Sequence, residues 1–142
     1  MKVLLLVLLS ISLQAQNYFE FPAELVRTID GDTYDLLVTV PDWDENFKDF
    51  KKIKLRIRLK NIDTYEMKKC DNDLPLDCEK QHDLAVRGKD YSDFMLTLRP
   101  FYIRYSDKYY DSRWVADVIF NDGSYLKDEL KAKGYTTGKY EK

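Results

Sequence analysis

The residues best suited to chemistry lie in three short stretches of the chain. Residues 30–33 read DGDT, residues 63–66 read DTYE and follow Arg58 closely, and Arg113 opens a later apolar run. Carboxylates and backbone carbonyls are the ligands of hard divalent cations, and guanidinium groups bind phosphate oxygens through paired donors. These residue types together predict a site for a cation and a phosphate, although each stretch alone is more typical of a tight turn or a surface ion pair.

The acids of this set divide into two roles. Asp32 and Asp63 can each offer a carboxylate to a metal ion, and the backbone carbonyl of Thr64 can add a neutral oxygen. Glu66 then remains to orient or deprotonate an attacking water molecule. The guanidiniums of Arg58 and Arg113 can stabilise the charge that develops on phosphate oxygens during cleavage of a phosphodiester.

Three strands are expected to carry the first two stretches. Residues 21–40 predict a hairpin around the Asp-Gly turn signal, and residues 41–52 predict an exposed loop. Residues 53–60 alternate strictly between apolar and basic side chains, which predicts a half-buried strand. Its basic face consists of Lys54, Arg56, Arg58 and Lys60. In a chain of net negative charge, this face favours a surface that meets an anion over one that is only solvated.

The remaining elements are two helices and two strands. Residues 77–98 have helical spacing, with the apolar side chains Leu84, Tyr91, Phe94, Met95 and Leu98 expected on the packed face. A turn is expected at 106–112 between strands 101–105 and 113–120, and Ser124 is expected to cap a short helix that ends at Gly134. The order of elements predicts a mainly β protein with helices (α+β): a five-stranded barrel with two or three appended helices.

Length and charge restrict the class of protein. The 142 residues carry a formal net charge of −2, which fits one domain over residues 17–142 and excludes a globally basic protein. A polyanion would therefore have to bind through a local basic patch. Residues 1–15 combine one lysine with an apolar run too short for a permanent membrane anchor, which predicts a secretory signal peptide and a secreted or periplasmic protein.

The two cysteines, Cys70 and Cys78, are closely spaced. In an exported protein this spacing favours a disulfide that closes the loop CDNDLPLDC. Free thiols are the first alternative. A zinc site is the second, but His82 is the only histidine in the chain, and two cysteines with one histidine make a poor zinc site.

These motifs together resemble the thermonuclease (staphylococcal-nuclease-like) family from about residue 24 to residue 140. The resemblance rests on IDGDT at 29–33, RLKNIDTYE at 58–66, DSRWVADV at 111–118 and DGSYLKDELKAKGY at 122–135. The family commonly shows R-L-x-x-I-D-T-P-E at the second of these places, with the same separation between arginine and aspartate.

The resemblance implies a fold, an activity and residue roles. The fold would be an OB barrel with packed helices, and the activity would be calcium-dependent hydrolysis of DNA and RNA by a monomer, leaving 3′-phosphates. Asp32, Asp63 and Thr64 would be the calcium ligands, Arg58 and Arg113 the catalytic arginines, and Glu66 the residue that acts on water. Tyr140 would lie near the bound nucleotide.

Two departures from the family pattern affect turnover more than chemistry. Tyr65 replaces a proline, which loosens the backbone that aims Glu66. Asp111-Ser112 replaces a Tyr-Gly pair before Arg113, so a stacking tyrosine is lost there and a negative charge is added. A non-catalytic OB-fold module that binds nucleic acid or a protein is the alternative, although relatives of that kind typically lose the arginines or the acids.

Overall fold

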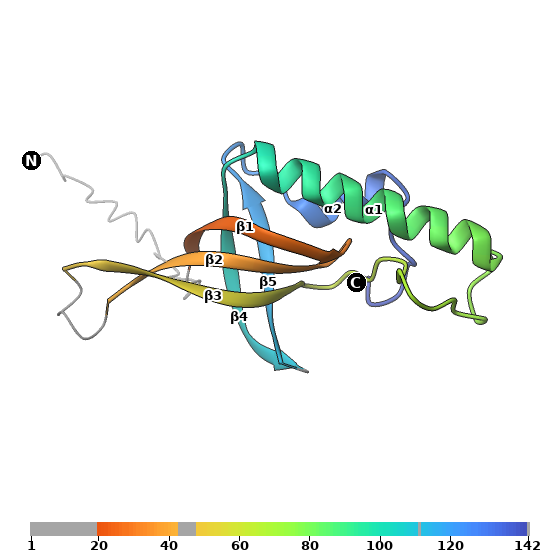
Figure 1. The fold of residues 1–142 in the computed structure, drawn as a ribbon, viewed down its shortest axis with the longest axis horizontal. Helices are drawn as coiled ribbons and strands as arrows, with labels where there is room; N and C mark the ends of the chain where they lie inside the picture. Colours follow the sequence, from red (N-terminus) through yellow and green to blue (C-terminus); the bar gives the residue numbers. More distant parts are fainter. Residues whose placement is uncertain (1–19, 43–47, 111, 142) are drawn as a thin grey trace, which may run out of the picture.

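The computed structural model describes residues 20–42, 48–110 and 112–141, so the expected signal peptide and Asp111 lie outside the described part. Within it, five strands close a barrel in the order β1-β2-β3-β5-β4, and two helices pack beside it (Figure 1). The elements are β1 Glu20–Asp30, β2 Thr33–Pro41, β3 Phe50–Leu59, α1 Cys78–Leu98, β4 Phe101–Tyr110, β5 Arg113–Phe120 and α2 Leu126–Ala132. The predicted α+β class and five-stranded barrel are confirmed.

The strand pairings place the candidate residues side by side. β2 and β3 are antiparallel, with Thr33 opposite Arg58, so the turn that contains Asp32 lies beside the end of β3. β3 and β5 are the one parallel pair among the described strands, with Arg58 opposite Val115, which brings the start of β5 to the same place. Closure of the barrel thus joins segments that are far apart in the sequence.

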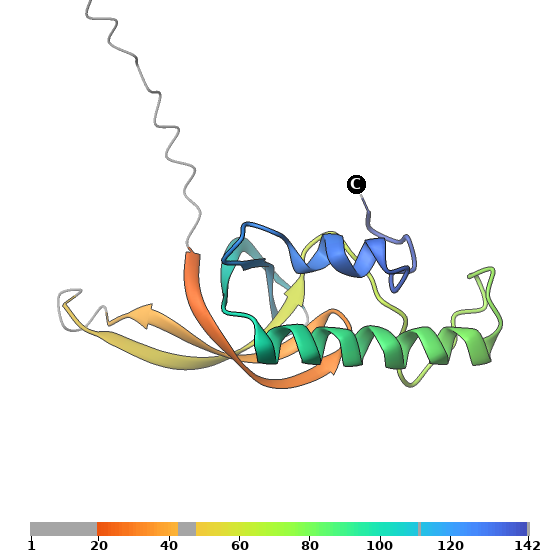
Figure 2. The same ribbon diagram turned by 90° about the horizontal axis from the view of Figure 1, so that it is seen from above.

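Two predicted connections are partly strands instead. Residues 50–52, expected in an exposed loop, continue β3, because Phe50 pairs with Pro41 and Lys52 pairs with Thr39. The turn expected at 106–112 begins later: β4 runs to Tyr110, with a register shift after Tyr105, and Ser112 lies in the turn before β5. The β2–β3 hairpin therefore extends past the rest of the barrel as an arm (Figures 1 and 2).

Helix α1 packs against the barrel through small side chains. Its buried residues are Gln81, Ala85, Gly88, Ser92 and Leu96. Phe94 and Leu98, expected on the packed face, are about 60% exposed, so that prediction is wrong for both. A Cβ at Gly88 would lie 3.2 Å from the Cβ of Tyr135, so glycine allows a close approach between α1 and the segment that follows α2.

Of the two residues expected to bound the short second helix, only the glycine has the expected role. Ser124 does not cap α2: its amide and hydroxyl donate to Asp122 Oδ1, and Tyr125 takes the N-cap position without a side-chain hydrogen bond. Gly134 follows the helix with a φ of 78°, as expected for a C-terminal glycine. Neither helix of the described part combines the length and apolar character that crossing a membrane requires.

Candidate functional site

Arg58 lies between the two aspartates predicted as metal ligands. Its Nη1 is 3.3 Å from Asp32 Oδ1, and its Nη2 is 3.0 Å from Asp63 Oδ1. Nη2 also donates to the carbonyl of Ile62 at 3.4 Å. Burial alone would lower the pKa of Arg58, but the two carboxylates outweigh burial and raise it above its ordinary value. One guanidinium therefore joins the β1–β2 turn to the loop that follows β3.

Asp32 is buried, and both of its carboxylate oxygens accept hydrogen bonds. Its side chain is 4% exposed; Oδ1 accepts from the hydroxyl of Thr33 at 2.9 Å, and Oδ2 accepts from the backbone amide of Thr64 at 2.9 Å. Its carbonyl accepts from the amide of Leu59. These bonds explain why residues 63–66 stay beside the β1–β2 turn although they belong to a loop.

Two hydroxyl groups, one from α1 and one from β2, hold the β1–β2 turn. The buried hydroxyl of Ser92 donates to the carbonyl of Gly31 at 2.8 Å, and the hydroxyl of Tyr34 donates to the same carbonyl. A Cβ at Gly31 would lie 3.0 Å from side-chain atoms of Thr64, so any larger residue at this position would have to displace the buried Thr64 side chain. Neither Ser92 nor Tyr34 was identified from the sequence, because their partner is a backbone oxygen of a distant segment.

Asp63 is held by the segment that follows α2. The hydroxyl of Thr137 donates to Asp63 Oδ2 at 2.8 Å, and the amide of Thr137 donates to the carbonyl of Asp63 at 2.8 Å. An isolated antiparallel bridge between Thr64 and Thr136 continues this contact. The C-terminal segment is thus part of the site; the resemblance implied this for Tyr140, but nothing in the sequence indicated the contact of Thr137 with Asp63.

A pocket of about 460 Å³ opens beside Arg58. Its lining includes the predicted residues Arg58, Asp63, Glu66, Arg113 and Tyr140. Asp32 and Thr64 are not in the lining, but both are joined to it, Asp32 through Arg58 and Thr64 through its amide bond to Asp32. The structure therefore brings every predicted site residue to one region of the barrel.

Asp30, at the end of β1, interacts with charged residues of the candidate site. Burial raises the pKa of Asp30, and the carboxylates of Asp32 and Glu66 raise it further, while Lys89 and Arg58 act in the opposite direction. The sequence analysis gave Asp30 no role of its own. Its raised pKa therefore reflects its burial first and the neighbouring carboxylates second.

The donor types fit an oxygen-seeking cation such as calcium. Asp32 and Asp63 supply carboxylate oxygens. Asp32 Oδ2 and both oxygens of Asp63 each accept one hydrogen bond and keep a second lone pair, whereas Asp32 Oδ1 already accepts from both Thr33 and Arg58. The carbonyl of Thr64 adds a neutral donor of the kind calcium takes. Among the described residues, however, no three His, Cys, Asp or Glu side chains are grouped closely enough to hold a metal by themselves. Carbonyl and water ligands would have to complete the shell.

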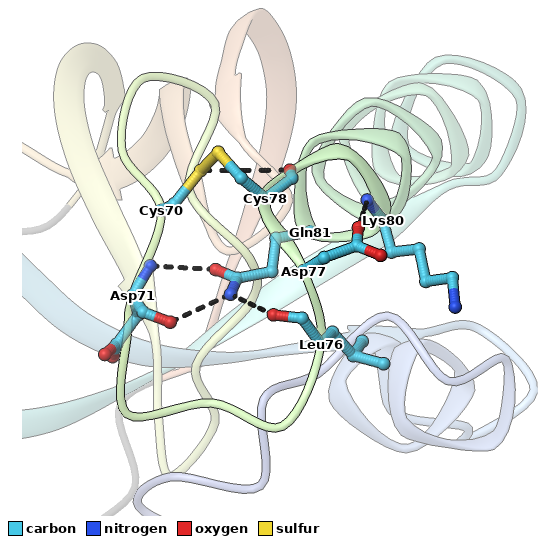
Figure 3. The surroundings of a disulfide bond; sticks show 7 residues. All are labelled: Cys70, Asp71, Leu76, Asp77, Cys78, Lys80 and Gln81. Carbon is cyan, nitrogen blue, oxygen red and sulfur yellow. Dashed lines mark hydrogen bonds between the residues drawn. A yellow bond between two sulfur atoms is a disulfide. The ribbon is translucent and has the colours of Figure 1, made fainter.

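The predicted disulfide joins Cys70 and Cys78 (Figure 3). The side-chain amide of Gln81 fills the loop that it closes, accepting from the amide of Asp71 and donating to the carbonyls of Asp71 and Leu76, each at 2.8 Å. The described part contains no free cysteine, so the alternative predictions of free thiols and of a zinc site are wrong.

This loop borders the candidate site. A second pocket, of about 520 Å³, lies between loop residues 69–74 and the C-terminal segment, and it shares Asp63, Glu66 and Tyr140 with the first pocket.

Two positions that depart from the pattern of the resembled family lie near the site. Tyr65, at the place where that family has proline, is buried. Ser112, just before Arg113, has a φ of 60°.

Comparison with known proteins adds no relative. No family model matches the chain, and no curated protein matches its sequence. The resemblance to the thermonuclease family thus stays an expectation drawn from the motifs and their spacing.

Proposed function

We propose that this protein is an exported, calcium-dependent nuclease of the thermonuclease type, which hydrolyses phosphodiester bonds in DNA and RNA. The observation that carries the proposal is the convergence of Arg58, Asp63, Glu66 and Arg113 on one pocket from β3, the following loop and β5. The disulfide supports an oxidising compartment, in line with the expected signal peptide.

The chain's own residues would perform hydrolysis in one displacement. Arg58 and Arg113 would bind the non-bridging oxygens of the scissile phosphate and stabilise their charge as water attacks. Glu66 would accept the proton of the water whose oxygen forms the new bond to phosphorus. Breakage of the bond to the 5′ oxygen leaves a 3′-phosphate on one fragment, and solvent protonates the 5′ oxygen of the other.

Binding of phosphate requires Arg58 to exchange partners. In the structure its donors face two carboxylates, so it must turn at least one donor towards the substrate. Calcium held by Asp32, Asp63 and the Thr64 carbonyl would supply positive charge that stabilises the developing phosphate charge. With those carboxylates neutralised, Arg58 is free to act on phosphate.

The second candidate is a non-catalytic OB-type module that binds nucleic acid or a protein. The ion pairs of Arg58 with both aspartates favour it, because a guanidinium between the acids can be a purely structural link. Such a module would bind strands without cutting them, and a chelator would not alter its binding.

One assay separates the two candidates. The purified protein is incubated with an end-labelled single-stranded oligonucleotide, with calcium or with a chelator, and the products are treated with phosphatase to reveal 3′-phosphates. We expect cleavage that needs calcium and that is lost in Asp32→Asn but kept in Asp83→Asn, a matched change on the exposed face of α1. An oligonucleotide that stays intact with calcium across a broad pH range would contradict the enzymatic proposal.

A further inference from the structure

A row of cations continues from Arg58 along the outer face of β3. The members of this row, here called the β3 basic row, are Lys52, Lys54 and Arg56. All three are exposed, whereas Ile53, Leu55 and Ile57 alternate with them and face the other way. The row thus starts next to the candidate site and runs outward along the β2–β3 arm.

The geometry of the row is that of an extended strand. Successive members are two residues apart, so their attachment points are separated by about 6.7 Å. This spacing is close to that of neighbouring phosphates in an extended single strand of nucleic acid. β5 pairs with β3 only at residues 57–59, so the row lies where β3 has β2 alone as its sheet neighbour and where the arm projects from the barrel (Figure 2).

The charges of the row exceed those of the acids that face it. Arg56 shares the carboxylate of Asp35 with Arg27, at 2.8 and 2.9 Å, so two cations meet one acid. Lys52 forms an ion pair with Glu24 at 3.1 Å, and both side chains are more than half exposed. Exposed ion pairs of this kind contribute little to stability, so Lys52 can exchange its partner at small cost. Among the described residues no carboxylate pairs with Lys54.

The row ends before the tip of the arm. There Asp42 pairs with Lys51, and the backbone amide of Asp42 donates to the carbonyl of Asp49, so acids return next to the strand ends. On this face of β3 the row of cations therefore runs from Arg58 to Lys52. A local basic stripe in a chain of net negative charge is what a polyanion-binding surface requires.

From these observations we infer that the β3 basic row binds the phosphates of single-stranded nucleic acid beyond the one at Arg58, an inference that rests on the proposed function. The row tracks the backbone, in the manner of a positively charged groove that carries no sequence information. Long strands therefore bind more tightly than short ones, and the extra affinity falls with salt.

Binding in the presence of a chelator tests the row without cleavage. Fluorescence anisotropy measures the affinity for oligothymidylates of about 4 and about 20 nucleotides over a range of salt concentrations. The variant is the double substitution Lys52→Gln with Lys54→Gln, and the control is Lys80→Gln, whose exposed side chain points away from the disulfide loop (Figure 3).

We expect the double variant to weaken binding of the long strand and to flatten its salt dependence. Each lysine that contacts a phosphate contributes about 0.7 to the log–log slope. When the salt concentration rises fourfold, the factor by which the affinity falls should therefore be about sevenfold larger for the parent than for the double variant, by the same relation. The short strand and the Lys80→Gln control should behave like the parent.

The outcomes separate this inference from the proposed function. Binding of long strands that depends on the row, without any cleavage in calcium, supports the row and contradicts hydrolysis. Cleavage in calcium with a long-strand affinity and salt slope unchanged in the double variant supports hydrolysis and overturns the row. Equal losses for short and long strands would also overturn it, because they would indicate a general change in the fold.

Discussion

Arg58 has one role in the structure without substrate and a different one in the proposed reaction. Without substrate it is a link between Asp32 and Asp63, with its side chain 20% exposed. In the proposed reaction it is a donor to phosphate on the lining of the pocket that also contains Arg113. A planar guanidinium can serve both, since its donors lie in a fixed fork, whereas a lysine ammonium cannot reach two acceptors in the same way.

The substitution Arg58→Lys tests that difference. It keeps the positive charge but loses the paired donors, so we expect turnover of a labelled oligonucleotide to fall by about 100-fold or more. Circular dichroism should show a retained fold. Arg87→Lys, in an exposed pair with Asp83 on α1, serves as the control and should keep full turnover. Activity of Arg58→Lys within threefold of the parent would show that the fork is not used in catalysis.

Asp35 makes folding stability depend on pH. The hydrogen bond from Arg56 lowers its pKa below the ordinary value, burial opposes this, and Arg27 lowers it further. Because the folded pKa lies below the unfolded one, the stabilisation is complete above the unfolded pKa, about 4, and is lost as the pH falls through the folded pKa.

We therefore expect Asp35→Asn to lower the free energy of unfolding by about 1–3 kcal/mol at neutral pH. In urea titrations the difference from the parent should shrink progressively below about pH 4. The same change at Asp83, whose side chain is 57% exposed, should have little effect at any pH. A difference at Asp35 that is independent of pH would show that the charge of this carboxylate is not the cause.

Among the elements, the loop between β3 and α1 has the most direct relation to the candidate site. Its first residues carry Asp63 and Glu66, and its last part is closed by the disulfide and filled by Gln81. Asp77 then caps α1 by accepting from the amide of Lys80 at 2.9 Å. The loop is thus anchored at both ends, by the β1–β2 turn and by the helix.

Removal of the disulfide, by Cys70→Ser with Cys78→Ser, should lower stability by about 2–3 kcal/mol, because the cross-link restricts a short loop in the unfolded chain. Urea unfolding with and without a thiol reductant measures this. The reductant should destabilise the parent by a similar amount and leave the double variant unchanged. Equal stability of oxidised and reduced parent protein would contradict the prediction.

For the molecule as a whole, the candidate metal ligands come from separate segments that folding must bring together. Asp32 precedes β2 and Asp63 follows β3, and Thr137 holds the latter from beyond α2. A cation bound to both aspartates therefore binds the folded chain in preference to the unfolded one, and its binding free energy adds to folding stability.

Calcium should accordingly raise the thermal unfolding midpoint of the parent, by an amount equivalent to about 2.7 kcal/mol at a hundredfold excess over the dissociation constant. Differential scanning calorimetry with calcium and with a chelator measures the shift. Asp32→Asn should abolish the shift, and Asp83→Asn should preserve it. A midpoint that calcium leaves unchanged in the parent would remove the metal from the proposal.

The sequence by itself determined those features that depend on neighbours along the chain. The alternation of residues 53–59 identified β3 and its basic face, and Asp-Gly at residues 30–31 identified the first turn. The helical spacing of residues 77–98 identified α1. These patterns are local because the side-chain period of a strand or a helix is set within a few residues. The same motifs named the residues that line the pocket.

Only the tertiary structure decided the contacts between distant segments. It placed one guanidinium between Asp32 and Asp63, brought Thr137 to Asp63 across 74 residues, and set Ser92 against Gly31. It also left Phe94 exposed, while the buried face of α1 includes the small residues Ala85, Gly88 and Ser92. Such choices depend on which surfaces pack together when the barrel closes, and periodicity along one segment contains no information about its partner.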